Sequence, residues 1–108
     1  MQIYDYSTSG GKNLIMAYID QLPVGVRTEI LEIRKLIREE GIPTFELLNT
    51  RQLFKKLWEI KISQERIMYV IRDQDSVFFL HACKKQKGKA EQKDIELAKK
   101  RAKAEGLL

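Results

Sequence analysis

The sequence contains very little cysteine, histidine or proline. There is one cysteine, Cys83, one histidine, His81, and two prolines in 108 residues. A single thiol excludes an intramolecular disulfide and any metal cage built from two cysteines, and the apolar run VFFLHAC favours a packed strand residue. A lone histidine gives no familiar metal-ligand spacing and cannot alone support a Ser-His-Asp arrangement. We therefore expect neither a metal nor another cofactor.

Long apolar runs and targeting signals are also missing. No stretch approaches the roughly 20 apolar residues that a membrane span needs. The N-terminal MQIYDYSTSGG has no charged region followed by an apolar one, as a signal peptide would. The segment SGGK lacks both the pattern and the strand–helix context of a phosphate-binding loop. These absences favour a cytoplasmic protein with no membrane partner and no nucleotide site of that type.

The chain does have an excess of positive charge. Charged residues make up 32% and hydrophobic residues 44% of the sequence, with a net charge of +5. Nine Lys or Arg and four Asp or Glu lie from Lys84 to the end, so this tail carries an excess equal to that of the whole chain. Such a balance favours polyanionic partners: nucleic acid, an acidic protein or an anionic membrane surface. The length predicts one domain, residues 1–108.

Hydrophobic spacing predicts two helices in the first half of this domain. The segment QIYDYS alternates apolar and polar residues, which predicts a short strand, and residues 13–21 are compatible with a short helix. Apolar residues then recur every three or four positions after Pro23, at Val26, Ile30, Ile33 and Ile37. Gly41 stands at the expected end of this second helix. Together the two helices predict a helical hairpin.

The second half predicts three strands and a final helix. The runs LFKKLWEIKIS, RIMYVIR and SVFFLHAC are joined by short connections, which indicates antiparallel neighbours. Residues 44–52 are predicted to be a connector that could include a helical turn. The charged tail predicts a helix from about Ala90, with a thin apolar stripe of Ile95, Leu97, Ala98 and Ala102. The alternation of Trp58 with Ile60 and Ile62 favours a core position for Trp58 over base stacking. The predicted class is α+β, with a small antiparallel sheet packed against the helical hairpin and a C-terminal helix, in the order β-α-α-β-β-β-α.

Residues 56–101 resemble a toxin family. The runs KLWEIKIS, RIMY, FFLHACKKQK and DIELAKKR, in this order, are similar to the phage-derived, HigB-like branch of the RelE/ParE toxin superfamily. Lys61 stands where that branch usually has arginine, no proline follows Lys85, and no tyrosine lies beyond Tyr69. The resemblance implies a type II toxin that cleaves messenger RNA on the ribosome without a metal, by attack of the RNA 2′-OH on the adjacent phosphate. It also implies a cognate antitoxin, often of the helix-turn-helix type, and operator DNA bound through the joint complex.

Metal-free RNA cleavage needs cations for the reacting phosphate and groups that move protons. Arginine and lysine suit the first need because they stay cationic and donate hydrogen bonds. The candidate catalytic residues are Lys61, Arg66, Lys84 and Lys85. Arg66 is assigned to the scissile phosphate, with a surface ion pair to Glu59 or Glu65 as the alternative. Lys61 would share that role or act as a base. Lys84 and Lys85 would bind phosphate or protonate the leaving group, and for all three lysines a solvated side chain is the alternative.

A second group of residues is assigned to RNA contacts. They are Lys55, Lys56, Glu59, His81, Lys87 and Lys89. Glu59 shares a strand face with Lys61 and could orient it, although a cross-strand ion pair is favoured. For His81, a half-buried, hydrogen-bonded ring is favoured over an acid–base role, because Leu80 and Ala82 flank it.

Three other functions remain open from the sequence. A ParE-like inhibitor of DNA gyrase would use the same fold, but it would not need cations at Lys61, Arg66 and Lys84. A module that binds nucleic acid without cutting it is supported by charge alone. A degenerate toxin would account for the departures from the family pattern.

Overall fold

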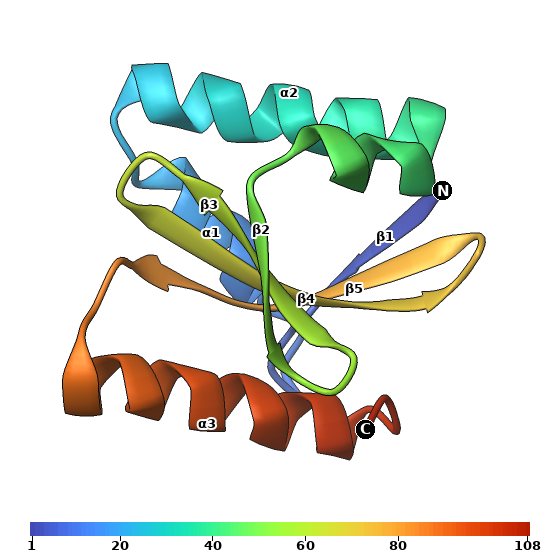
Figure 1. The fold of residues 1–108 in the computed structure, drawn as a ribbon. Coiled ribbons are helices and arrows are strands. Elements are labelled where there is room, and N and C mark those ends of the chain that lie inside the picture. Colours follow the sequence, from blue (N-terminus) through green and yellow to red (C-terminus); the bar gives the residue numbers. More distant parts are fainter.

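The computed structural model describes residues 1–108 and forms one mixed five-stranded sheet with helices on both faces (Figure 1). The strands lie in the order β1-β5-β4-β3-β2. Their bounds are β1 Gln2–Asp5, β2 Thr50–Phe54, β3 Leu57–Ile62, β4 Glu65–Asp73 and β5 Ser76–Lys84. The helices are α1 Leu14–Asp20, α2 Val24–Glu40 and α3 Gly88–Ala104, with a 3-10 helix, η1, over Ile42–Leu47. The predicted α+β class is confirmed.

Strands β2 to β5 form an antiparallel meander, as the short connections predict for β3, β4 and β5. Two features of the sheet differ from the prediction. Strand β1 pairs with β5 in parallel, because the chain crosses over through α1 and α2 before the meander starts. Residues 44–52, predicted to be a connector that could include a helical turn, do contain most of η1, but they also contain the start of β2, which was not predicted. β2 is a five-residue edge strand with one neighbour, and so short a segment carries little periodic signal.

Local capping explains where α1 and α2 begin and end. The side chain of Asn13 accepts a hydrogen bond from the Met16 N–H at 2.9 Å, which starts α1. Helix α2 buries Ile30 and Ile37 on the predicted stripe. It ends at Gly41, whose φ of 74° suits glycine and whose N–H donates to the carbonyl of Ile37. The predicted helical hairpin is therefore confirmed.

The two faces of the sheet have separate apolar clusters. On one face, α1, α2 and η1 cover a cluster of 12 buried residues. They are Ile15, Ile19, Leu22, Ile30, Ile37, Phe45, Ile60, Ile62, Ile67, Tyr69, Val77 and Phe79. On the other face, α3 covers six: Leu57, Met68, Val70, Leu80, Ala98 and Ala102. Figure 1 shows α2 and α3 on opposite sides of the sheet.

Helix α3 begins two residues earlier than predicted, at Gly88. It contacts the sheet through Ala98 and Ala102, which are both fully buried. Leu97, predicted to belong to the same stripe, is 36% exposed. Small side chains let the helix lie close to the sheet but bury little apolar surface. None of the helices combines the length and the apolar character that crossing a membrane would require.

Candidate functional site

Lys61 and Arg66 are direct cross-strand neighbours. They pair in the register of β3 and β4, next to the turn that joins these strands. Side chains alternate along a strand, so Lys61 shares a face with Leu57, and Arg66 with Met68, on the side that α3 covers. Both residues are partly exposed, and neither forms an ion pair. Two cations are therefore held side by side, and neither lies within ion-pair distance of a carboxylate.

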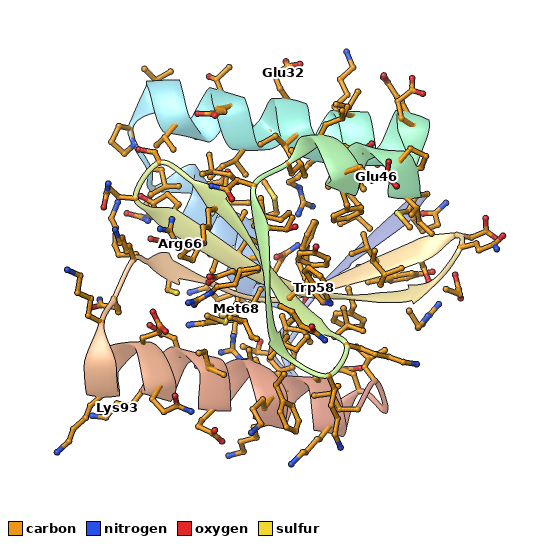
Figure 2. The ribbon with its side chains drawn as sticks, in the orientation of Figure 1. Glu32, Glu46, Trp58, Arg66, Met68 and Lys93 are labelled. Carbon is orange, nitrogen blue, oxygen red and sulfur yellow. The ribbon has the colours of Figure 1, made fainter.

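The guanidinium of Arg66 is fixed by the backbone of its own hairpin. Its Nη1 donates to the carbonyl oxygens of Ser63, at 3.0 Å, and of Glu65, at 2.8 Å. The other guanidinium N–H groups have no protein acceptor. The ion pair with Glu59 or Glu65 that was the alternative reading of Arg66 does not form. Figure 2 shows Arg66 toward the end of the sheet that lies above the start of α3. The group is thus oriented while several donors stay free for an anion.

Lys84 does not join this pair. Its Nζ donates to Glu65 Oε2, and the hydroxyl of Tyr18, from α1, donates to Oε1 of the same carboxylate. Glu65 is 3% exposed, and burial next to this carboxylate raises the pKa of Tyr18. Because side chains alternate along β5, Lys84 points to the face that α1 covers, opposite to its neighbour Cys83. The predicted grouping of Lys84 with Lys61 and Arg66 is wrong for this reason.

The loop between β5 and α3 brings further cations to the same end of the sheet. Lys85 and Lys87 of the loop, and Lys89 in the first turn of α3, are exposed, and none forms an ion pair. The N–H of Lys85 donates to the carbonyl of Gln64 at 2.7 Å, which ties this loop to the β3–β4 turn. The structure therefore places the loop lysines beside the hairpin that carries Lys61 and Arg66.

Glu59 is occupied by an ion pair. It is 2% exposed, and its Oε2 lies 2.7 Å from Nε of Arg51, its cross-strand partner on β2. The contact is electrostatic without an aligned hydrogen bond, since neither atom has a hydrogen-bond partner. Arg51 also lies 3.4 Å from Glu91 in the first turn of α3. The predicted cross-strand ion pair is confirmed, and the additional contact of Arg51 with α3 was not predicted.

His81 is half-buried and hydrogen-bonded, as predicted. Its Nε2 lies 2.8 Å from Oδ1 of Asp94 on α3, and its Nδ1 lies 3.4 Å from Nη1 of Arg101. Next to it on the same face, burial raises the pKa of the Cys83 thiol to about 12, with the carboxylates of Asp94 and Glu59 acting in the same direction. The predicted packed position of Cys83 is confirmed. Sequence reasoning missed Asp94 and Arg101, because only the docking of α3 brings them to this place.

Lys55 and Lys56 lie at the other end of β3, in the β2–β3 turn. Five residues separate Lys56 from Lys61, which is roughly 17 Å along a strand. The Nζ of Lys55 lies 5.1 Å from the centre of the Phe54 ring, over which Lys99 of α3 also sits at 3.9 Å. These two lysines are therefore not brought together with the other RNA-contact candidates.

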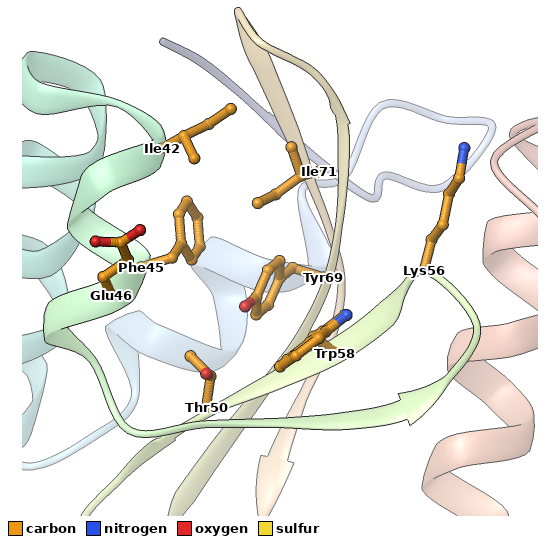
Figure 3. A pocket seen from close by; sticks show the side chains of 8 residues that line it. All are labelled: Ile42, Phe45, Glu46, Thr50, Lys56, Trp58, Tyr69 and Ile71. Carbon is orange, nitrogen blue, oxygen red and sulfur yellow. The ribbon is translucent and has the colours of Figure 1, made fainter.

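Trp58 lines a groove on the face opposite to Lys61 and Arg66. It is 36% exposed, so the core position predicted for it is wrong. The groove has a volume of about 470 Å³ between η1 and the sheet (Figure 3). Phe45 and Tyr69 stack in its floor with ring centres 4.9 Å apart. Burial raises the pKa of Tyr69 to about 12. Trp58 stays exposed because α1 and α2 do not reach over this part of the sheet.

The order of elements and the five-stranded sheet with helices before and after its meander are those of a RelE-like α+β fold. The family model described as phage-derived protein Gp49-like (DUF891) matches residues 17–103. The chain belongs to this family, which is RelE-like and toxin-like in general. No curated protein gives a significant match.

Proposed function

We propose that this protein is the toxin of a type II toxin–antitoxin system, of the HigB-like kind, and that it cleaves translated messenger RNA on the ribosome without a metal. One observation carries this proposal. Lys61 and Arg66 lie side by side on one sheet face without an ion pair, next to a loop that carries Lys85 and Lys87 and to the first turn of α3, which carries Lys89. Membership in the Gp49-like family supports a toxin, and the cation pair supports phosphate chemistry.

The geometry suits a cleavage in which the RNA supplies its own nucleophile. The 2′-OH loses its proton and attacks the adjacent phosphorus, the bond to the 5′ oxygen breaks, and this oxygen takes up a proton, while negative charge builds on the phosphate oxygens in the transition state. Arg66 can bind this charge with donors that its two backbone contacts have already oriented, so little reorganisation is needed. Lys61 supplies the second positive charge, and Lys85 is placed to hold a neighbouring backbone phosphate.

The same proposal includes partners and a place of action. A cognate antitoxin, of the helix-turn-helix type, would neutralise the toxin, and the joint complex would bind operator DNA. The ribosome would present the message in the cytoplasm. Lys85 and Lys87 of the loop and Lys89 of α3 would contact RNA backbone in the complex, since lysines that bind phosphates release the counterions condensed on the RNA.

The decisive experiment measures cleavage by purified ribosomes programmed with a defined message, using primer extension to map the cuts. We expect the wild type to cut within the translated region, and only when ribosomes are present. Lys61→Ala and Arg66→Ala should each slow cleavage by about 100-fold or more, the usual cost of losing one donor to a transition-state oxyanion.

Arg72→Ala is the matched control, because Arg72 also lies on β4 but is exposed and pairs with Asp73. It should cleave like the wild type. Equal rates for Arg66→Ala and the wild type would remove Arg66 from the mechanism. Growth arrest on expression with intact message and damaged DNA would instead indicate a gyrase inhibitor. Message binding without cuts would indicate a binding module.

A further inference from the structure

Three potential metal ligands meet beneath α3, although the sequence separates them. His81 and Cys83 are two residues apart on β5, so their side chains lie on the same face, and Asp94 comes from the second turn of α3. One ligand atom from each of the three residues lies within 4.8 Å of the others. The proposed cleavage of RNA does not use this cluster. All three side chains are partly buried, so they are shielded from bulk water while remaining reachable.

A small hollow lies beside two of these ligands. Its volume is about 10 Å³, and Cys83 and Asp94 line it together with Glu59 and Arg66. That volume is about the space that one water molecule needs. A single ion fits there, and a larger ligand does not.

We propose that His81, Cys83 and Asp94 bind one Zn²⁺ ion that ties α3 to β5. Nitrogen, sulfur and carboxylate oxygen are the donors that zinc uses, and three protein ligands leave a fourth tetrahedral position for water. This donor set is too soft for Mg²⁺ or Ca²⁺, which take oxygen ligands.

The distances need only small side-chain movements. Zinc bonds of roughly 2.0–2.3 Å place tetrahedral ligand atoms roughly 3.3–3.6 Å apart. The Nε2 of His81 and Oδ1 of Asp94, now 2.8 Å apart, must separate slightly, and the widest pair of the three must close from at most 4.8 Å. Rotations about the side-chain bonds of Cys83 and Asp94 achieve both without moving the backbone.

Zinc binding changes the protonation of two of its ligands, Cys83 and His81. The thiol of Cys83 releases one proton when it binds as thiolate. The ring of His81 stays neutral and binds through Nε2, so its proton moves to Nδ1. The long contact of 3.4 Å between Nδ1 and Arg101 is then lost, while Arg101 keeps its 2.9 Å bond to the carbonyl of Leu80. Binding therefore replaces the 2.8 Å hydrogen bond between His81 and Asp94 with a bond from each residue to the ion, so α3 stays tied to β5.

The test uses Co²⁺ as a coloured substitute for Zn²⁺ on the untagged full chain. Cys83 and His81 are the only cysteine and histidine in the sequence, so any thiolate-to-cobalt absorption band must come from this site. We expect a band that saturates at one ion per chain and disappears when Zn²⁺ is added. Cys83→Ser should remove the band and weaken Zn²⁺ binding by more than about 100-fold, beyond what the loss of an outer-shell partner causes.

Two further measurements keep the test independent of folding and of RNA cleavage. Asp94→Asn should keep the thiolate band but weaken Zn²⁺ binding, whereas Asp75→Asn, in the exposed β4–β5 turn, should bind like the wild type. Zn²⁺ should also raise the Tm of the wild type and leave that of Cys83→Ser unchanged, because the ion joins two elements of the folded state only. Absence of the band, or equal Zn²⁺ affinity in the wild type and Cys83→Ser, would overturn the proposal.

Discussion

The two faces of the sheet differ in what they bury. The face under α1 and α2 is a continuous apolar core with one buried ion pair, between Arg34 and Asp5. The face under α3 has half as many buried apolar residues, and the rest of its area carries the charged and polar groups around Arg66 and His81.

This difference indicates how a small domain can keep its main apolar core apart from the face that is proposed to act on RNA. The first face supplies most of the apolar burial, so it determines whether the chain folds. On the second face, α3 packs on the sheet through Ala98 and Ala102, and Lys61 and Arg66 lie at one end of β3 and β4 without an ion pair. The comparison can be tested by substitutions that touch one face and spare the other.

The largest loss of unfolding free energy should come from substitutions in the core under α1 and α2. Phe79 and Leu80 are neighbours on β5 that point to opposite faces, and both are buried. Phe79→Ala should lower the free energy of unfolding by about 3–5 kcal/mol, and Leu80→Ala by about 2–3 kcal/mol, because α3 can settle into part of the space. Urea unfolding measures both. If Leu80→Ala lost as much unfolding free energy as Phe79→Ala, or more, the face under α1 and α2 would not be the main source of stability.

Asp5 and Glu59 are buried carboxylates that each pair with an arginine, one on each face of the sheet. Substituting them tests the same difference between the faces. Asp5 accepts from both Nη atoms of Arg34, at 2.9 and 2.7 Å, and both side chains are less than 10% exposed. Asp5→Asn leaves a buried, unpaired guanidinium and should cost about 3–5 kcal/mol. Glu59→Gln should cost less than about 1 kcal/mol, because Arg51 is 42% exposed and water can solvate it. Similar losses of unfolding free energy in the two variants would refute this distinction.

A smaller effect is expected at the cluster of Tyr18, Glu65 and Lys84. Tyr18→Phe removes one hydrogen bond to a buried carboxylate, and Lys84 still pairs with it. The expected loss of unfolding free energy is about 1.5 kcal/mol, the lower end for a bond to a charged group. Tyr4→Phe is the control, since Tyr4 is 42% exposed and its hydroxyl makes no hydrogen bond within the protein. A cost for Tyr18→Phe no larger than that of the control would place Glu65 and Lys84 outside any structural role.

The free energy of unfolding should also depend on alkaline pH, through a different titrating residue on each face. Burial raises the pKa of Cys83, under α3, to about 12 from 9.0, and that of Tyr69, under η1, to about 12 from 10.0. A raised pKa contributes stability that is fully present below the unfolded value and is lost as pH rises through the folded one. The loss should therefore begin near pH 9 through Cys83, and Tyr69 should add to it only above pH 10.

Urea unfolding at several pH values tests this order. Cys83→Ser should keep its stability constant from pH 9 to pH 10, where the wild type declines. The thiol should also react slowly with iodoacetamide at pH 8 in the folded protein and rapidly in urea. Fast labelling of the folded protein would contradict the burial of Cys83.

The sequence predicted those parts that local signals determine. The spacing from Val26 to Ile37 and the glycine at position 41 define α2, and the strand patterns define β4 and β5. The sequence did not predict the features that depend on tertiary contacts. Edge strand β2 exists because β3 pairs with it, Trp58 is exposed because no helix covers it, and Lys84 turns away because Glu65 and Tyr18 bind it. The cluster of His81, Cys83 and Asp94 depends on the docking of α3, which no short-range pattern specifies.

The smallest effect on stability should come from the residues proposed to act on RNA. Neither Lys61 nor Arg66 forms an ion pair, and Arg66 contacts only two carbonyl groups next to a turn. Two like charges directly opposite each other across a pair of strands destabilise the sheet. Lys61→Ala should therefore leave the free energy of unfolding within about 0.5 kcal/mol of the wild type, or raise it slightly. Measuring urea unfolding and cleavage on the same variant distinguishes a loss of chemistry from a loss of stability. A variant that loses cleavage but keeps its stability has lost chemistry alone, whereas a loss of more than about 1 kcal/mol would make Lys61 a structural residue of the face under α3.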